Sequence, residues 1–125
     1  MILPIAELVY MTRRRANARL FIEHDVPVAV ATDFCSSIHA TSLLNTVATA
    51  APWFRMTPGE VIVGATLNAA YSLGRQSSCG SLDIGKRGDV VVLDCPHPDE
   101  VCLAVGAPLL DQVVIAGRIV HGAGS

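Results

Sequence analysis

The chain has 125 residues, of which 51% are hydrophobic, and its formal net charge is −2 at pH 7. This length suffices for one domain with a buried core, but it is short of the roughly 250 residues of a complete eight-stranded α/β barrel. The charge gives no electrostatic reason to expect nucleic acid or an anionic membrane as partner, and no apolar stretch reaches the roughly 20 residues that span a bilayer.

The first third of the chain alternates strand-like and helix-like segments. Residues 2–5 are apolar but contain Pro4, which indicates a strand or its exit loop rather than a helix start. A turn-wise apolar stripe predicts a helix over 12–24, and an apolar β-type run over 28–32 then ends on Asp33. The order strand, helix, strand implies that the two strands are parallel neighbours.

Two helices are expected in the middle of the chain. The first covers about 40–51 and is closed by Pro52. The second begins with Thr57 as N-cap, Pro58 at the first helical position and Glu60 three residues after the cap, a pattern typical of a capping box.

The pattern changes in the last part of the chain. A further helix over 67–73 ends at Gly74, and a turn-rich segment covers 80–88. An apolar strand is predicted over 89–94, and residues 113–120 indicate two short strands joined by a tight turn. A small β unit is therefore expected to follow an α/β part.

Asp33 is the first candidate site residue. A carboxylate that ends a buried strand lies at a sheet edge or barrel mouth, where a parallel α/β fold keeps its chemistry. A helix N-cap or an Asx-turn is the structural alternative. His39 follows in the same loop and is the only histidine expected near the site, as a substrate contact or an adventitious metal ligand.

The other polar residues are expected to be structural. The basic run 13–15 is more typical of a solvated helix face than of a binding patch. His24 is expected to complement the dipole at a helix C-terminus. Cys35 has no recognisable catalytic partner pattern, which favours a packed loop cysteine over a reactive thiol.

Three blocks of sequence resemble a known family. They are 26–34 (VPVAVATDF), 54–58 together with 65–74 (FRMTP and ATLNAAYSLG), and 80–94 (GSLDIGKRGDVVVLD). Their order and spacing resemble the C-terminal part of the metal-dependent amidohydrolase superfamily and, within it, the imidazolonepropionase family. The third block is the general superfamily signature, whereas the first two narrow the resemblance to imidazolonepropionases.

This resemblance implies an α/β fold that is the C-terminal portion of a TIM-like (β/α)8 barrel plus part of a small β-sandwich. Residues 1–79 would form the last βα units of the barrel, and 80–125 the C-terminal segment of the composite sandwich. The implied reaction is hydrolysis of the ring C–N bond of 4-imidazolone-5-propanoate to N-formimino-L-glutamate, in histidine degradation. Another cyclic-amide hydrolase or deaminase of the superfamily, or a non-catalytic remnant of the fold, is the alternative.

The resemblance also implies a role for Asp33. In the family, an Asp at this strand end binds one divalent metal, zinc or iron, and accepts a proton from the metal-bound water. The family's histidine ligands have no counterpart here, so the chain alone is expected to be inactive. Cys35 stands where the family typically has Asn, in a shorter loop, and this departure is the reason for the alternative of another cyclic-amide hydrolase or deaminase.

The expected partner is a small-molecule substrate, with no nucleic acid and no membrane. Association as a homodimer or through exposed barrel edges is a further expectation, because unpaired strands invite pairing. The four cysteines show no CxxC spacing and follow no signal-peptide pattern, which favours reduced thiols in a cytoplasmic protein.

Overall fold

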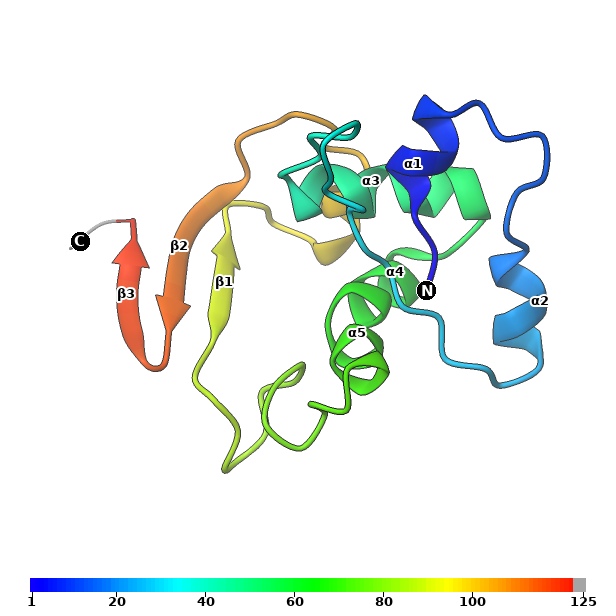
Figure 1. The fold of residues 1–125 in the computed structure, drawn as a ribbon. Helices are drawn as coiled ribbons and strands as arrows, with labels where there is room; N and C mark the ends of the chain where they lie inside the picture. The colour runs from blue at the N-terminus through cyan, green and yellow to red at the C-terminus, as the bar shows by residue number, and fades with distance from the viewer. Residues whose placement is uncertain (123–125) are drawn as a thin grey trace.

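The computed structural model describes residues 1–122. Helices occupy one side of the molecule and a three-stranded sheet the other (Figure 1). The elements in chain order are α1 (Pro4–Val9), α2 (Ala18–Glu23), α3 (Leu43–Phe54), α4 (Pro58–Ala65), α5 (Leu67–Ser72), β1 (Val90–Leu93), the 3-10 helix η1 (Pro98–Cys102), β2 (Leu110–Ile115) and β3 (Arg118–His121). The last three residues of the expected segment 80–125 lie outside the described part.

The core lies where residues 28–30 meet α3 and α4. Val30, Val61 and Phe54 are buried there with the alanines of α3. Gly64 lets α4 approach closely, because a Cβ at that position would lie 2.9 Å from Val30 Cγ2. This approach fixes the segment that leads to Asp33.

The strand predicted over 28–32 is reduced to a single parallel bridge between Ile2 and Val30. Ile2 N donates to Ala29 O at 2.8 Å, and Ala31 N donates to Ile2 O at 3.1 Å. The predicted parallel arrangement of the two segments is confirmed, but the predicted length of the strand over 28–32 is wrong. Two residues after Ile2 the chain enters α1 at Pro4, so the parallel pairing does not continue in that direction.

On its other side, the segment is held by helices rather than by a strand. Val30 N donates to Gly64 O at 3.0 Å, and Asn68 Nδ2 donates to Val28 O at 3.1 Å. Val28 O, Ala29 O and Val30 N are thus paired without a second neighbouring strand.

The expectation that Pro4 prevents a helix was wrong, because Pro4 is the first residue of α1. At that position the missing N–H has no intrahelical partner in any case, and the fixed φ of proline already suits a helix. The strand-like pairing expected nearby is confined to Ile2.

The helix predicted over 12–24 is confined to α2, so its first half was wrong. Asn17 caps α2, its side chain accepting a hydrogen bond from Leu20 N at 3.1 Å. The preceding segment is held instead by Glu7, whose Oε1 accepts from Ala16 N at 3.1 Å and whose backbone O accepts from Thr12 N at 3.2 Å. These contacts to α1 replace a helical ladder over 12–17.

The third and fourth helices are close to prediction. α3 begins after Ser42, which caps Asn45 N, and it continues through Pro52 to Phe54 rather than ending before the proline. Pro52 lies in the last turn, so it interrupts the helix only near its end. The capping box that begins α4 is confirmed, with Thr57 and Glu60 bonded reciprocally.

The last part of the chain forms the expected β unit. Its strands are antiparallel in the order β1-β2-β3, and β2 begins at Leu110, three residues earlier than predicted. The turn Ala116-Gly117 is tied to the start of β1, since Ala116 N donates to Asp89 Oδ1 at 2.8 Å and Gly117 N to Gly88 O at 2.9 Å.

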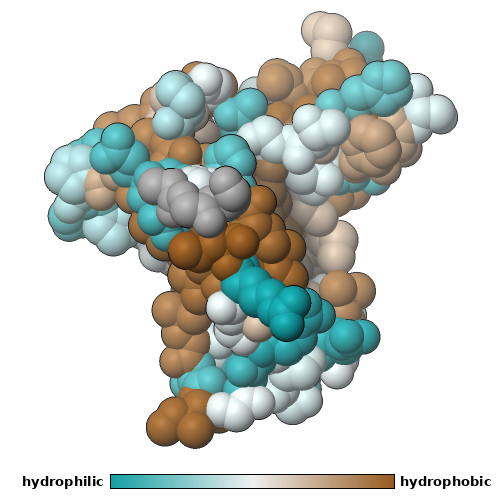
Figure 2. All heavy atoms as spheres, turned by 90° about the vertical axis from the view of Figure 1, so that its left-hand side faces the viewer, coloured by the Kyte–Doolittle hydropathy of each residue, from teal (hydrophilic) through white to brown (hydrophobic). Residues whose placement is uncertain are grey.

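The sheet contains no fully buried residue among its described strands, and β3 is exposed throughout. Figure 2, which faces the sheet side of the molecule, shows apolar surface near the C-terminal strands and at the lower end of the molecule. By contrast, η1 places Val101 in the core against α3 and α4. The boundary between 79 and 80 stays a prediction.

Candidate functional site

Asp33 follows the buried segment directly. Val28, Ala29 and Val30 are each less than 5% exposed, whereas Asp33 is half-buried. Its backbone is in the left-handed region, with φ +55°, which turns the chain out of the extended segment. Asp33 therefore lies beyond the bridged residue Val30, at the start of the loop that carries His39, as the sequence predicts.

The loop after Asp33 is closed by its own backbone. Cys35 N donates to Ile38 O at 2.9 Å, and Ile38 N donates to Cys35 O at 3.2 Å. Ile38 is 3% exposed and anchors the loop in the interior. The rings of Phe34 and His39 lie 6.0 Å apart between centroids, tilted by 35°. His39 is exposed, so an aromatic pair lies on the surface beside Asp33.

A second contact holds the same loop from outside. The hydroxyl groups of Tyr10 and Ser37 are 2.6 Å apart, and Ser37 Oγ lies 3.4 Å from Cys35 Sγ. The hydrogen bond from the Ser37 side chain lowers the pKa of the Cys35 thiol. Sequence reasoning missed Tyr10 and Ser37, because their contact joins positions 27 apart in the chain.

The described residues do not complete a metal site. Within residues 1–122, no group of three or more His, Cys, Asp or Glu side chains is arranged to hold a metal ion. A catalytic zinc usually has three protein ligands. The described part of the chain therefore does not by itself fit the metal that its resemblance implies.

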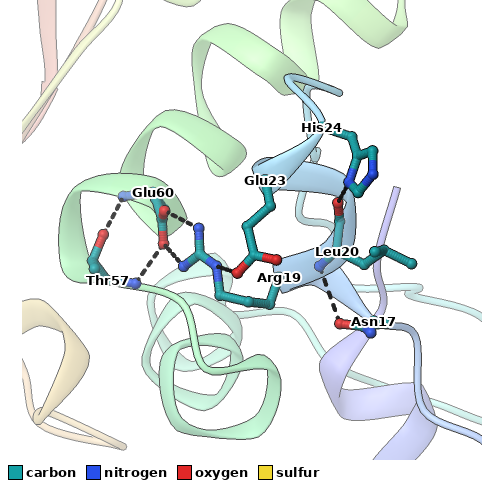
Figure 3. A network of polar contacts seen from close by, with 7 residues as sticks. All are labelled: Asn17, Arg19, Leu20, Glu23, His24, Thr57 and Glu60. Carbon is teal, nitrogen blue, oxygen red and sulfur yellow. Dashed lines mark hydrogen bonds and ion pairs between the residues drawn. The ribbon is translucent and has the colours of Figure 1, made fainter.

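A polar network joins α2 to α4 (Figure 3). Arg19 donates two hydrogen bonds to Glu60, at 2.7 and 3.0 Å, and its Nε lies 3.5 Å from Glu23. The hydrogen bond from Arg19 lowers the pKa of Glu60 to about 2, with further contributions from Thr57 at the N-cap of α4. His24 ends α2, where its Nδ1 lies 2.9 Å from Leu20 O. Its expected place at a helix C-terminus is confirmed.

No helix within residues 1–122 combines the length and apolar character that crossing a membrane requires. The four cysteines are free, as expected.

The sequence matches the amidohydrolase family over residues 3–120. It is 33% identical to an imidazolonepropionase of Treponema denticola, covering 95% of this chain and 29% of that protein. It is 37% identical to an imidazolonepropionase of Shouchella clausii, covering 95% of this chain and 27% of that protein. The chain thus spans less than a third of the length of these curated relatives.

Solved structures of two enzymes share the fold. An adenosine deaminase from Xanthomonas campestris with bound zinc superposes with a TM-score of 0.85 at 23% identity, covering 96% of this chain and 31% of that one. An atrazine chlorohydrolase from Arthrobacter aurescens with zinc gives 0.81 at 20% identity, covering 96% and 30%. With the sequence match over nearly its whole length, the chain belongs to the amidohydrolase family.

Proposed function

We propose that this chain forms the C-terminal part of an imidazolonepropionase-type hydrolase, in which Asp33 belongs to the catalytic site. The substrate would be 4-imidazolone-5-propanoate, whose ring C–N bond is hydrolysed to give N-formimino-L-glutamate. The proposal is supported by the similarity to proteins named imidazolonepropionase over nine-tenths of the chain. The structural observation that carries it is the position of Asp33 at the end of the buried parallel segment.

We propose that Asp33 acts as a general base and then as a general acid, a role that a single carboxylate can fill. It accepts a proton from the attacking water and returns it to the ring nitrogen that leaves. A divalent metal, zinc or iron, would lower the pKa of water at a complete site. Asp33 would contribute one ligand to such a site, with the remaining ligands outside this sequence.

The loop beyond Asp33 is proposed to contact the substrate. Phe34 and His39 present exposed rings beside the carboxylate, and a planar heterocycle can stack on such rings. Cys35 and Ser37 occupy the part of the loop where the sequence departs from the imidazolonepropionase pattern. A different cyclic amide or a deaminase substrate is therefore the alternative within the family, and a non-catalytic remnant is the alternative outside enzymes.

The uncovered apolar surface supports a role as part of a larger structure. Large hydrophobic side chains protrude from the loop before β1 and from the sheet, among them Leu82 at 79% exposure and Ile84, which is fully exposed. Exposed patches of this kind mark surfaces that pack against other polypeptide. Further amidohydrolase chain is the partner that the coverage of the relatives suggests.

The first experiment uses the chain alone. Ring opening of 4-imidazolone-5-propanoate is followed spectroscopically with added zinc, iron or manganese. We expect no turnover and weak metal binding, because one ligand does not hold a catalytic metal. Turnover above the uncatalysed rate would show that the 125 residues carry a complete site.

The second experiment tests this sequence as part of a full-length enzyme. This sequence replaces its matching segment in the imidazolonepropionase of Geobacillus thermodenitrificans, to which it is 35% identical over 98% of its length. The hybrid is expected to open the imidazolone ring, and Asp33→Asn to lower kcat by a factor of about 10² or more. Asparagine tolerates the left-handed backbone of residue 33, so this variant keeps the fold.

Asp25→Asn is the matched control, because Asp25 is an exposed turn residue that also has positive φ. An Asp33→Asn hybrid as active as its parent would refute the proposed role. A hybrid that binds metal and hydrolyses other cyclic amides or deaminates purines, but leaves imidazolone intact, would refute the substrate. A folded, metal-loaded hybrid without any activity would favour the non-catalytic remnant.

A further inference from the structure

A cavity of about 510 Å³ lies between α2 and the end of α3. The polar and aromatic residues that line it are Arg15, Asn17, Arg19, Glu23, Trp53 and Arg55. None of residues 33–39 lines it, so it is separate from the loop that carries Asp33. Its volume falls within the range of pockets that bind small molecules.

The cavity is rich in positive charge that the protein itself does not neutralise. Arg19 is engaged by Glu60 and Glu23 (Figure 3). Arg15 and Arg55, however, have no ion pair with any residue in the described range 1–122. The chain as a whole is slightly acidic, so this concentration of guanidinium groups is local.

Arg15 is held in a geometry suited to binding an anion. Its guanidinium carbon lies 3.8 Å from the centre of the Trp53 ring. The ring is fixed in turn, because Trp53 Nε1 donates to Glu7 Oε2 at 3.2 Å. A guanidinium stacked on an aromatic face keeps its N–H groups in its own plane, where they are available for a two-point contact with oxyanions.

Arg55 has an unusual backbone for its residue type. It follows α3 with φ +56° and ψ +42°, a left-handed conformation that glycine usually adopts at the end of a helix. Arg55 thus lines the cavity together with Arg15, and neither arginine has an ion pair within residues 1–122. Backbone outliers of this kind cluster at ligand sites.

We infer that this cavity is a binding site for a small multivalent oxyanion, held by Arg15 and Arg55. Two guanidinium groups without partners match two or more oxygens of one ligand, either phosphoryl or carboxylate oxygens. Glu23, which also lines the cavity, lies 3.5 Å from Arg19 Nε. The inference does not depend on the proposed hydrolase activity, because the two sites share no residue.

Trp53 provides the readout, since it is the only tryptophan of the chain. The full chain is titrated with pyrophosphate and, in a second arm, with citrate, while sodium chloride at equal ionic strength serves as reference. We expect a saturable change in Trp53 fluorescence with at least one of the two ligands and none with chloride. The arm that saturates at lower concentration identifies phosphoryl or carboxylate oxygens as the preferred chemistry.

Two variants test the residues. Arg15→Lys keeps the charge but loses the planar fork, and Arg55→Asn keeps the left-handed backbone but loses the charge. Each is expected to weaken binding about tenfold, the effect of one charge-assisted hydrogen bond. Arg118→Gln is the control, because Arg118 is exposed on β3 and does not line the cavity.

Calorimetric titration supplies a second measurement, because Arg15→Lys alters the surroundings of the indole itself. Circular dichroism shows whether each variant keeps its helices. Equal affinity of parent and Arg55→Asn, or a response that chloride reproduces, would overturn the inference. Absence of saturation in both arms with the folded parent chain would overturn it as well.

Discussion

At the scale of single residues, Glu60 combines two functions in one side chain. Its carboxylate completes the capping box by accepting from Thr57 N at 2.8 Å, and it accepts both hydrogen bonds of the Arg19 fork. The side chain is 26% exposed, so these bonds are partly shielded from water. Glu60 therefore couples the start of α4 to α2, and the coupling depends on its negative charge.

Glu60→Gln is expected to reduce stability at pH 7 by about 1–2 kcal/mol, a value lowered for partial exposure to solvent. The pKa of Glu60 is about 2 in the fold against an ordinary 4.5. Its stabilisation is complete above about pH 4.5 and is lost as the pH falls through about 2. Urea unfolding at a series of pH values measures how the free energy of unfolding changes with pH. The decrease toward low pH should be smaller in the variant than in the parent.

Glutamine can still accept the capping hydrogen bond as a neutral side chain. The difference in stability between the parent and Glu60→Gln therefore reports the contribution of the negative charge. Glu100→Gln serves as the matched control, since Glu100 has no ion pair among residues 1–122. An identical pH slope in the parent and in Glu60→Gln would contradict the assignment.

Residue-scale predictions from the sequence succeeded where the cause is local. An apolar run that ends on a carboxylate predicts the place of Asp33 before the His39 loop, whereas its catalytic role stays a prediction. Arg15, in contrast, was expected on a solvated helix face. Its contact with Trp53 depends on the hydrogen bonds of Glu7 to Ala16 and Trp53. These bonds join residues far apart in the chain, so a local sequence pattern does not predict them.

At the scale of elements, α4 packs closely against residues 28–30, the segment that leads to Asp33. Gly59 and Gly64 lie in this same helix but in different surroundings. A Cβ at Gly59 would meet nothing within 4 Å, whereas one at Gly64 would lie 2.9 Å from Val30 Cγ2 and 3.1 Å from Val28 O. Only the second glycine is required by packing against the segment that leads to Asp33.

Gly64→Ala is expected to destabilise the chain by about 1–3 kcal/mol, because the added methyl overpacks the contact with Val30. Gly59→Ala is expected to be neutral or stabilising by up to about 1 kcal/mol, since alanine favours a helix and meets no obstacle. Chemical unfolding of both variants measures the difference. Equal effects of the two substitutions would show that α4 does not approach residues 28–30 as described.

The accuracy of the predicted elements follows the range of the interactions that form them. The capping box at Thr57 is completed within four residues, and the sequence predicted it correctly. The apolar stripe over 12–24 predicts a helix that includes residues 12–17, yet contacts with Glu7 in α1 hold these residues in a loop. Pro4 and Pro52 predict an interruption of helical structure, but each lies near a helix end, where proline is tolerated.

At the scale of the whole molecule, the uncovered sheet and the loop before β1 dominate its surface properties. The strands at both edges of the sheet, β1 and β3, offer unpaired backbone groups. Such edges invite pairing with another chain unless something covers them. The chain on its own is therefore expected to bind to itself.

Sedimentation velocity of the chain alone should show association that increases with concentration, together with binding of a dye specific for apolar surfaces. Ile84→Lys and Leu82→Lys are expected to raise the monomer fraction, because both side chains are largely exposed. Val105→Lys, in an exposed loop elsewhere, is the comparison. A chain that stays monomeric at all concentrations and binds no dye would contradict this expectation.

The short helix η1 has a consequence for how the molecule melts. It lies between β1 and β2 in the chain, yet Val101 is buried among the helices, only 5% exposed. Heating should therefore give a single calorimetric transition, with equal calorimetric and van't Hoff enthalpies. Val101→Ala, which weakens this link, is expected to separate the transition into two, because the strands are then held less firmly to the helices and melt first.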